Sequence, residues 1–96
     1  MQDLVNKLSK ELEIPKERII NESINVFLER ELRNASAEIL EIKTKFNVST
    51  PKELKNKLEK GLVDEHPAWE KLIYWENLEK RMRVVNNWIR KLYTSS

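Results

Sequence analysis

Two stretches of the sequence repeat apolar residues at alternating steps of three and four. The first contains Leu28, Leu32, Ala35, Ile39, Ile42 and Phe46, and the second contains Trp75, Leu78, Met82, Val85, Ile89 and Leu92. Heptad spacing of this kind keeps an apolar seam on one side of a helix and favours packing against a second helix. The two seams match in period, and the intervening segment is long enough to return the chain. We therefore predict an all-α fold, a small helical bundle built on an antiparallel pair of long helices over about 15–47 and 67–93.

Proline and glycine mark where two further, short helices begin and end. Helix-forming residues dominate between these breaks, which predicts short helices over about 2–13 and 51–60. The second of them has a capping box, with Thr50 before Pro51 and Glu53 three residues later, and we expect Gly61 to end it in a left-handed conformation. Pro67 should hold His66 extended where the last helix opens.

The chain is expected to form a single domain, residues 1–96, because 96 residues suffice for only one hydrophobic core. Within it, the helix pair of residues 1–33 is predicted to serve dimerisation, and the helical hairpin of residues 34–96 is predicted to bind a partner.

Apolar residues are dense in the first third of the chain. The set comprises Leu4, Leu8, Leu12, Ile20, Ile24 and Phe27. The stripe of the first helix is expected to dock on the second helix, whose first half should be more buried than its second half. One short helix pair cannot cover all six side chains, and each contributes about 1.5–3 kcal/mol when fully buried. We therefore predict that these residues form the interface of a homodimer.

The last helix carries a second apolar stripe on the side opposite its seam. At 100° per residue, this stripe consists of Trp69, Ile73, Val84 and Trp88. One interpretation is that the short helices or a second copy cover it. The other is that the two tryptophans anchor a protein partner, since aromatic residues dominate binding hot spots.

Basic residues gather near the C-terminus and suggest an alternative partner. Arg81, Arg83, Arg90 and Lys91 lie in a segment without acidic residues, so a small nucleic-acid-binding regulator is a second hypothesis. The net charge is only +2, and Arg83 and Arg90 point to a different side of the helix from Lys91. DNA is therefore not the favoured partner. A structural dimer or assembly protein is the third hypothesis.

The residues needed for common catalytic chemistry are missing from the sequence. There is no Cys, His66 is the single His and Gly61 the single Gly, which exclude thiolate catalysis, a His-based triad or metal centre, and a glycine-rich phosphate loop. We expect no enzymatic activity, no metal and no cofactor. The apolar runs are far shorter than the roughly 20 residues that span a bilayer, so we expect a cytoplasmic protein with no membrane partner.

The segment from Asp3 to Arg33, DLVNKLSKELEIPKERIINESINVFLERELR, resembles the two helices of ribbon-helix-helix antitoxins and repressors. That family reads DNA with a strand that precedes its first helix, whereas only Met1 and Gln2 precede Asp3 here, so we expect the DNA-reading strand to be missing. The remainder, with STPKEL and HPAWEKLIYWENLE, is similar to small helical proteins of archaea and thermophilic bacteria encoded beside toxins.

The resemblance implies an antitoxin-like protein of a toxin–antitoxin module. Such a protein would pair with itself through its N-terminal helices and neutralise a toxin partner with its C-terminal helices. A charged fraction of 35%, a single Gln and no Cys favour a thermophilic host, while nine Asn residues argue against one.

Overall fold

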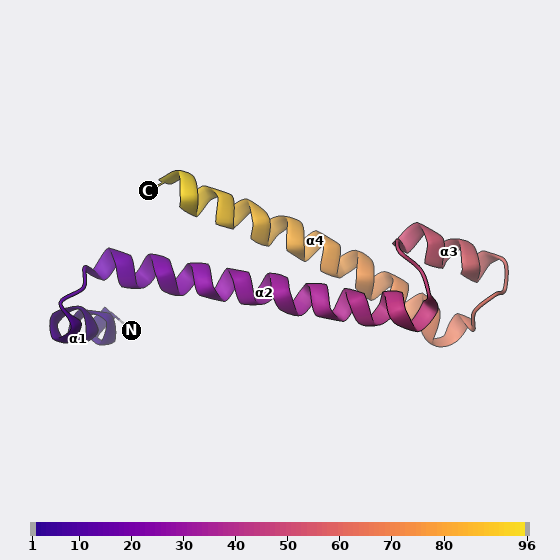
Figure 1. The fold of residues 1–96 in the computed structure, drawn as a ribbon, viewed down its shortest axis with the longest axis horizontal. Helices are drawn as coiled ribbons and strands as arrows, with labels where there is room; N and C mark the ends of the chain where they lie inside the picture. The colour runs from indigo at the N-terminus through magenta and orange to yellow at the C-terminus, as the bar shows by residue number, and fades with distance from the viewer. Residues whose placement is uncertain (1, 96) are drawn as a thin grey trace.

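Four helices account for most of the chain in a computed structural model that describes residues 2–95. They are α1 (Gln2–Leu12), α2 (Lys16–Phe46), α3 (Pro51–Glu59) and α4 (Glu65–Ser95). The two long helices α2 and α4 run antiparallel, with α3 at the end where they are connected and α1 at the far end (Figure 1). The predicted all-α fold is confirmed, and the helix bounds lie within two residues of the predicted ones. Met1 and Ser96, which the predicted domain includes, lie outside the described residues.

The ends of α3 have the geometry that the sequence predicts. The Glu53 N–H donates to Thr50 Oγ1 at 3.1 Å, and the Glu53 carboxylate accepts from the Ser49 N–H at 2.8 Å. Gly61 ends the helix at φ +68°, and the Leu62 N–H donates to the Lys57 carbonyl at 2.9 Å. Each end therefore satisfies backbone groups that a helix terminus leaves unpaired.

The helices α1 and α2 end at non-glycine residues in the left-handed region. This backbone conformation was not predicted from the sequence. Asn47 closes α2 at φ 51°, with the Val48 N–H donating to the Lys43 carbonyl. Glu13 closes α1 at φ 55°. At the start of α4, His66 is extended (φ −103°, ψ 119°), so the regular helix begins at Pro67 as predicted.

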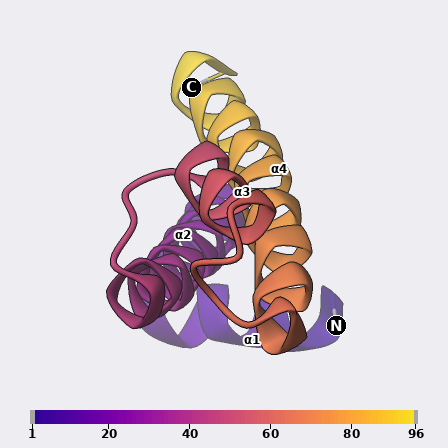
Figure 2. The same cartoon turned by 90° about the vertical axis from the view of Figure 1, so that its right-hand side faces the viewer.

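The hydrophobic core lies at the connected end of the hairpin, which we call the closed end. Here α3 lies across the ends of α2 and α4 (Figure 2). Trp75 is 1% exposed and Leu54 is fully buried. The core residues are Ala35, Ile39, Ile42, Phe46, Val48, Leu54, Leu58, Ala68, Leu72, Trp75 and Leu78.

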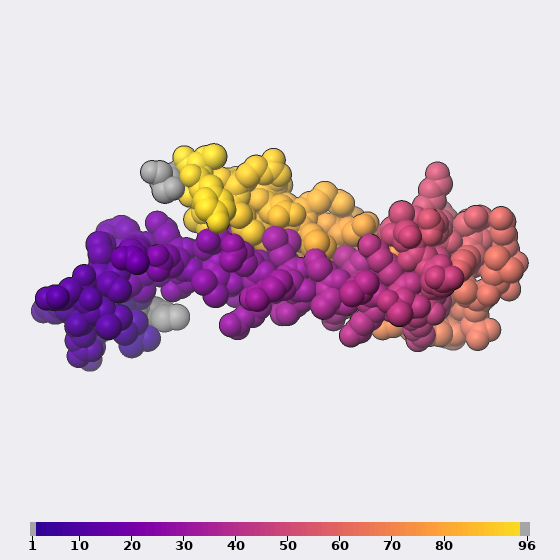
Figure 3. Space-filling view, viewed as in Figure 1, coloured from indigo at the N-terminus to yellow at the C-terminus, as the bar shows by residue number. Residues whose placement is uncertain are grey.

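The molecule is an extended rod rather than a compact globule. Its principal extents are 61 × 24 × 17 Å and its radius of gyration is 19.4 Å, whereas a compact chain of this length would have a radius of gyration of about 12–13 Å. The space-filling view shows α1 and the start of α2 extending beyond the rest of the chain (Figure 3). No helix among the described residues has both the length and the apolar character needed to cross a bilayer.

Two expectations about burial in the N-terminal third are wrong for the single chain. The first half of α2 is its less buried half, because Leu28 is the first buried residue along the described chain. The stripe of α1 is also not docked on α2, and its leucines are 38–58% exposed. The reason is that α1 contacts α2 on the side away from α4, through an edge of α1 that includes the half-buried Val5 and Ser9 (Figure 1).

Candidate protein-binding surfaces

The second apolar stripe of α4, which we call the outer stripe, is exposed. Its members are Trp69, Ile73, Val84 and Trp88, and their exposed fractions lie between 40% and 55%. The opposite side of the helix carries the seam that packs against α2, where Trp75, Leu78 and Val85 are buried. At 1.5 Å per residue the outer stripe extends about 28 Å along α4. The alternative in which α1 and α3 cover this stripe is therefore wrong for the single chain.

The surroundings of Trp88 make it a suitable anchor. The ammonium of Lys91 lies 4.4 Å from the centroid of the Trp88 ring system, over its face. A cation at this distance is attracted by the negative face of the aromatic ring and limits the side-chain orientations of both residues. A side chain that is already restrained loses less conformational entropy when a partner covers it.

The four basic residues of the alternative nucleic-acid hypothesis do not form one cationic face. Arg81 is paired with Glu31 of α2, and Arg90 donates to Asn87 Oδ1 at 3.2 Å. Lys91 lies over Trp88, and Arg83 is exposed. Two of the four cations are therefore engaged with a carboxylate or an aromatic ring.

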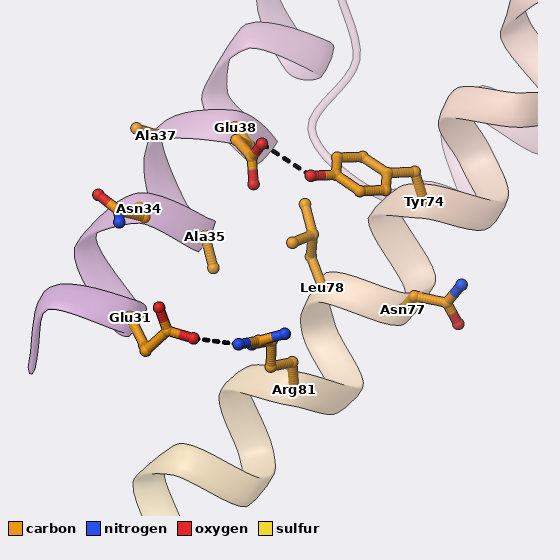
Figure 4. Close-up of a pocket in the computed structure, with 9 residues that line it drawn as sticks. All are labelled: Glu31, Asn34, Ala35, Ala37, Glu38, Tyr74, Asn77, Leu78 and Arg81. Atoms are coloured by element: carbon orange, nitrogen blue, oxygen red, sulfur yellow. Dashed lines mark hydrogen bonds and ion pairs between the residues drawn. The ribbon is translucent and has the colours of Figure 1, made fainter. Parts of the chain in front are cut away.

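Two polar contacts across the hairpin define how α2 and α4 are aligned. The Tyr74 hydroxyl donates to a Glu38 carboxylate oxygen at 2.7 Å, and Arg81 pairs with Glu31 (Figure 4). From one contact to the other, the residue number falls by seven on α2 and rises by seven on α4. Both contacts therefore follow one antiparallel register. They flank an open groove of about 690 Å³ that includes Ala35 and Leu78 in its lining.

The carboxylate of Glu38 changes the acidity of Tyr74. The hydrogen bond to Glu38 raises the pKa of the Tyr74 phenol above its ordinary value of 10.0, and partial burial and the negative charge act in the same direction. The protonated phenol is the donor, so this contact requires a neutral Tyr74. The contact therefore persists across the neutral pH range.

The same register predicts which residues oppose each other beyond these contacts. Glu38, Glu31 and Ile24 are seven residues apart on α2, as are Tyr74, Arg81 and Trp88 on α4. One heptad past the Glu31–Arg81 pair, Trp88 is therefore aligned with Ile24. The helices diverge toward this end (Figure 1), and both side chains are exposed, at 52% and 42%. The flank of the hairpin thus changes from polar pairs to unpacked apolar residues.

The predicted dimer residues are all exposed in the single chain. Ile20, Ile24 and Phe27 share one side of α2, which we call the arm face, and they are 40–58% exposed. The leucine stripe of α1 comprises Leu4, Leu8 and Leu12. The structure keeps these two sets as separate surfaces on two helices.

The single His of the chain lies beside a carboxylate at the start of α4. His66 Nδ1 lies 3.3 Å from Glu70 Oε1, and both side chains are largely exposed. Within residues 2–95, no group of three or more His, Cys, Asp or Glu side chains is placed to hold a metal ion.

Comparison with known proteins gives one match. The family described as "Uncharacterized protein MJ0235 family" matches residues 1–96. The chain belongs to this family. No curated protein and no solved structure is detectably similar to it. The family description states no activity or partner.

The cross-helix pairs Glu38–Tyr74 and Glu31–Arg81 were missed in the sequence. All four residues directly precede a seam residue, at the heptad position that flanks a coiled-coil seam and pairs across it. The heptad pattern therefore contains a signal for these pairs. It places an acidic residue at two such positions of α2 and a hydrogen-bond donor at two such positions of α4.

Proposed function

We propose that this protein is a non-catalytic protein-binding module, and specifically an antitoxin-like protein that neutralises a toxin partner. The observation that carries the proposal is the outer stripe, which places two tryptophans and two aliphatic residues on one exposed side of α4. The stripe consists of two apolar pairs, Trp69 with Ile73 and Val84 with Trp88, and exposed apolar patches of this kind mark binding sites.

The chemistry of the outer stripe suits a protein partner better than a nucleic acid. Tryptophan contributes large apolar contact area with few rotatable bonds, and it is enriched among the residues that dominate protein interfaces. A helix laid along a 28 Å stripe, or a groove that receives α4, would contact residues spaced as Trp69, Ile73, Val84 and Trp88 are.

The class of partner follows from resemblance alone. The apolar spacing of the N-terminal third resembles that of the helix pair of ribbon-helix-helix antitoxins, and the phrases STPKEL and HPAWEKLIYWENLE resemble small proteins encoded beside toxins. A toxin blocked by direct contact needs no chemistry from its antitoxin. The proposal therefore assigns no catalytic residue and no cofactor.

The proposal is tested by purifying the tagged protein from its native host at moderate salt and identifying what co-elutes by mass spectrometry. We expect one small protein, encoded nearby, in a fixed ratio to the bait. Trp69→Ala and Trp88→Ala together should weaken its binding at least about 30-fold, since hot-spot truncations cost about 2 kcal/mol or more. The melting temperature should change little.

Leu40→Ala is the matched control, because Leu40 is 62% exposed and lies off the outer stripe. This variant should bind as the unmodified protein does. Unchanged binding by the double tryptophan variant would contradict the proposal, as would recovery of nucleic acid alone that is lost as salt rises.

A further inference from the structure

The N-terminal arm, residues 2–27, is the part of the molecule with helical structure but no core. None of its residues is buried, although it contains six regularly spaced large apolar side chains. Helices as short as α1 are marginal without tertiary packing. The arm therefore needs a surface that the single chain does not supply.

The area of the whole chain indicates how much surface is left uncovered. Its accessible surface is 7654 Å², whereas a compact chain of 11.5 kDa would have about 5,800 Å². The excess is roughly 1,800 Å², and a stable interface buries about 800 Å² on each partner. The uncovered surface is therefore larger than an interface with a second copy of the chain requires.

The two apolar sets of the arm match each other in length. On α1, Leu4 to Leu12 extends about 12 Å, and on α2, Ile20 to Phe27 extends about 10 Å. Each set has its apolar residues three or four positions apart, which is the spacing that lets two helices pack.

Within one chain these two sets are kept apart by the turn between the helices. The Ser9 hydroxyl donates to the Ile14 carbonyl at 2.6 Å, and the Ile14 N–H donates to the Ser9 carbonyl at 3.2 Å. With Glu13 in the left-handed region, this short turn holds α1 on the side of α2 away from α4. The stripe of α1 therefore does not cover the arm face of its own chain.

We propose that the arm is a reciprocal dimer interface, in which the leucine stripe of α1 in one copy covers the arm face of α2 in a second copy, and the reverse. Because the two copies cover each other in return, the exchange closes after two chains. Leu8 lies on α1, away from the outer stripe, so it tests this proposal separately from the proposed function.

The first test is the mass of the full chain in solution, measured by light scattering and sedimentation over a range of concentrations. We expect twice the chain mass of 11.5 kDa. Leu8→Lys and Ile24→Lys should each weaken self-association roughly tenfold or more, because each places a charge in an apolar contact. Leu40→Lys should leave the dimer intact. A monomer at all concentrations overturns the proposal.

The second test identifies which surfaces meet. The chain contains no Cys, so single Leu8→Cys and Ile24→Cys variants can be mixed and treated with a short thiol-to-thiol crosslinker. These are the middle residues of the two sets, so they oppose each other whichever direction α1 runs. We expect efficient crosslinking only in the mixture, and none between Leu8→Cys and Leu40→Cys.

Crosslinking of Leu8→Cys with itself, without crosslinking in the mixture, would overturn the reciprocal arrangement by showing that the two α1 helices pack together. If Leu8→Lys loses the dimer but still binds the partner, the dimer interface and the partner-binding surface are distinct. Circular dichroism verifies that each variant keeps its helical structure.

Discussion

The closed end of the hairpin and the N-terminal arm both carry regularly spaced apolar residues, but only the closed end has a core. At the closed end three elements converge, since α3 lies across the ends of α2 and α4, and Leu54 and Trp75 are shielded from solvent. In the arm, α1 meets α2 alone and on one edge, so Leu4 and Phe27 are each 58% exposed. Apolar spacing determines which side of a helix can be buried. Burial itself requires neighbours on that side.

The largest expected effect is the loss of a core side chain at the closed end. Leu54→Ala should lower the free energy of unfolding by about 2–5 kcal/mol, because it removes buried methyl groups and leaves a cavity. Urea denaturation of the variant and of the unmodified chain measures the difference. Leu40→Ala, at an exposed site, should change stability by no more than about 0.5 kcal/mol. A loss at Leu54 as small as this control would show that the closed end is not the stabilising core.

A cap on α3 is expected to matter less. Thr50→Ala removes the oxygen that accepts from the Glu53 N–H and should cost about 1 kcal/mol. Thr50→Ser keeps the acceptor and should stay close to the unmodified protein. Thermal unfolding followed by circular dichroism compares the two. Equal stability of both variants would show that the closed end holds α3 without its cap.

Truncation in the arm should cost least among the apolar changes. At dilutions where the chain is monomeric, Phe27→Ala should lower the free energy of unfolding by less than about 1 kcal/mol, because Phe27 is already 58% exposed. At higher concentrations the loss should grow, since a second copy would bury this side chain. Urea denaturation at two protein concentrations measures both values. A loss as large as that at Leu54 under monomeric conditions would show that the arm has an internal core.

The smallest expected effect lies between the two regions, at the Tyr74–Glu38 hydrogen bond. Because the pKa of Tyr74 is raised in the folded chain, its contribution to stability is fully present below a pH of about 10 and is lost as pH rises through the raised pKa. Tyr74→Phe should therefore be slightly less stable than the unmodified protein at neutral pH. The difference should shrink above a pH of about 10. A difference that stays constant up to strongly alkaline pH would show that the phenol does not donate to Glu38.

Periodicity identified the outer stripe, the leucine stripe of α1 and the arm face, but not whether each surface is buried or exposed. Trp69 and Trp88 were recognised as a second stripe opposite the seam, while their exposure depends on α1 and α3 lying elsewhere. The arm residues were expected to be buried in part by α2, and this was wrong because the turn at Ser9 and Ile14 directs α1 to another side. The Glu31–Arg81 pair required the register of two helices that are distant in sequence.

By itself, the sequence determined the elements and their seams. The bounds of α3 follow from Thr50, Glu53 and Gly61, because caps and left-handed residues act through hydrogen bonds over a few positions. The heptad spacing determined that two long helices pair, because a stripe at that period must be covered by another helix.

Only the tertiary structure decided which apolar face of α4 packs and which remains exposed, and that no described residue before Leu28 is buried. The physical reason is that both faces satisfy the same helical period, so the choice depends on contacts with α2 and α3 far along the chain. Burial of the arm depends on contacts beyond the single chain.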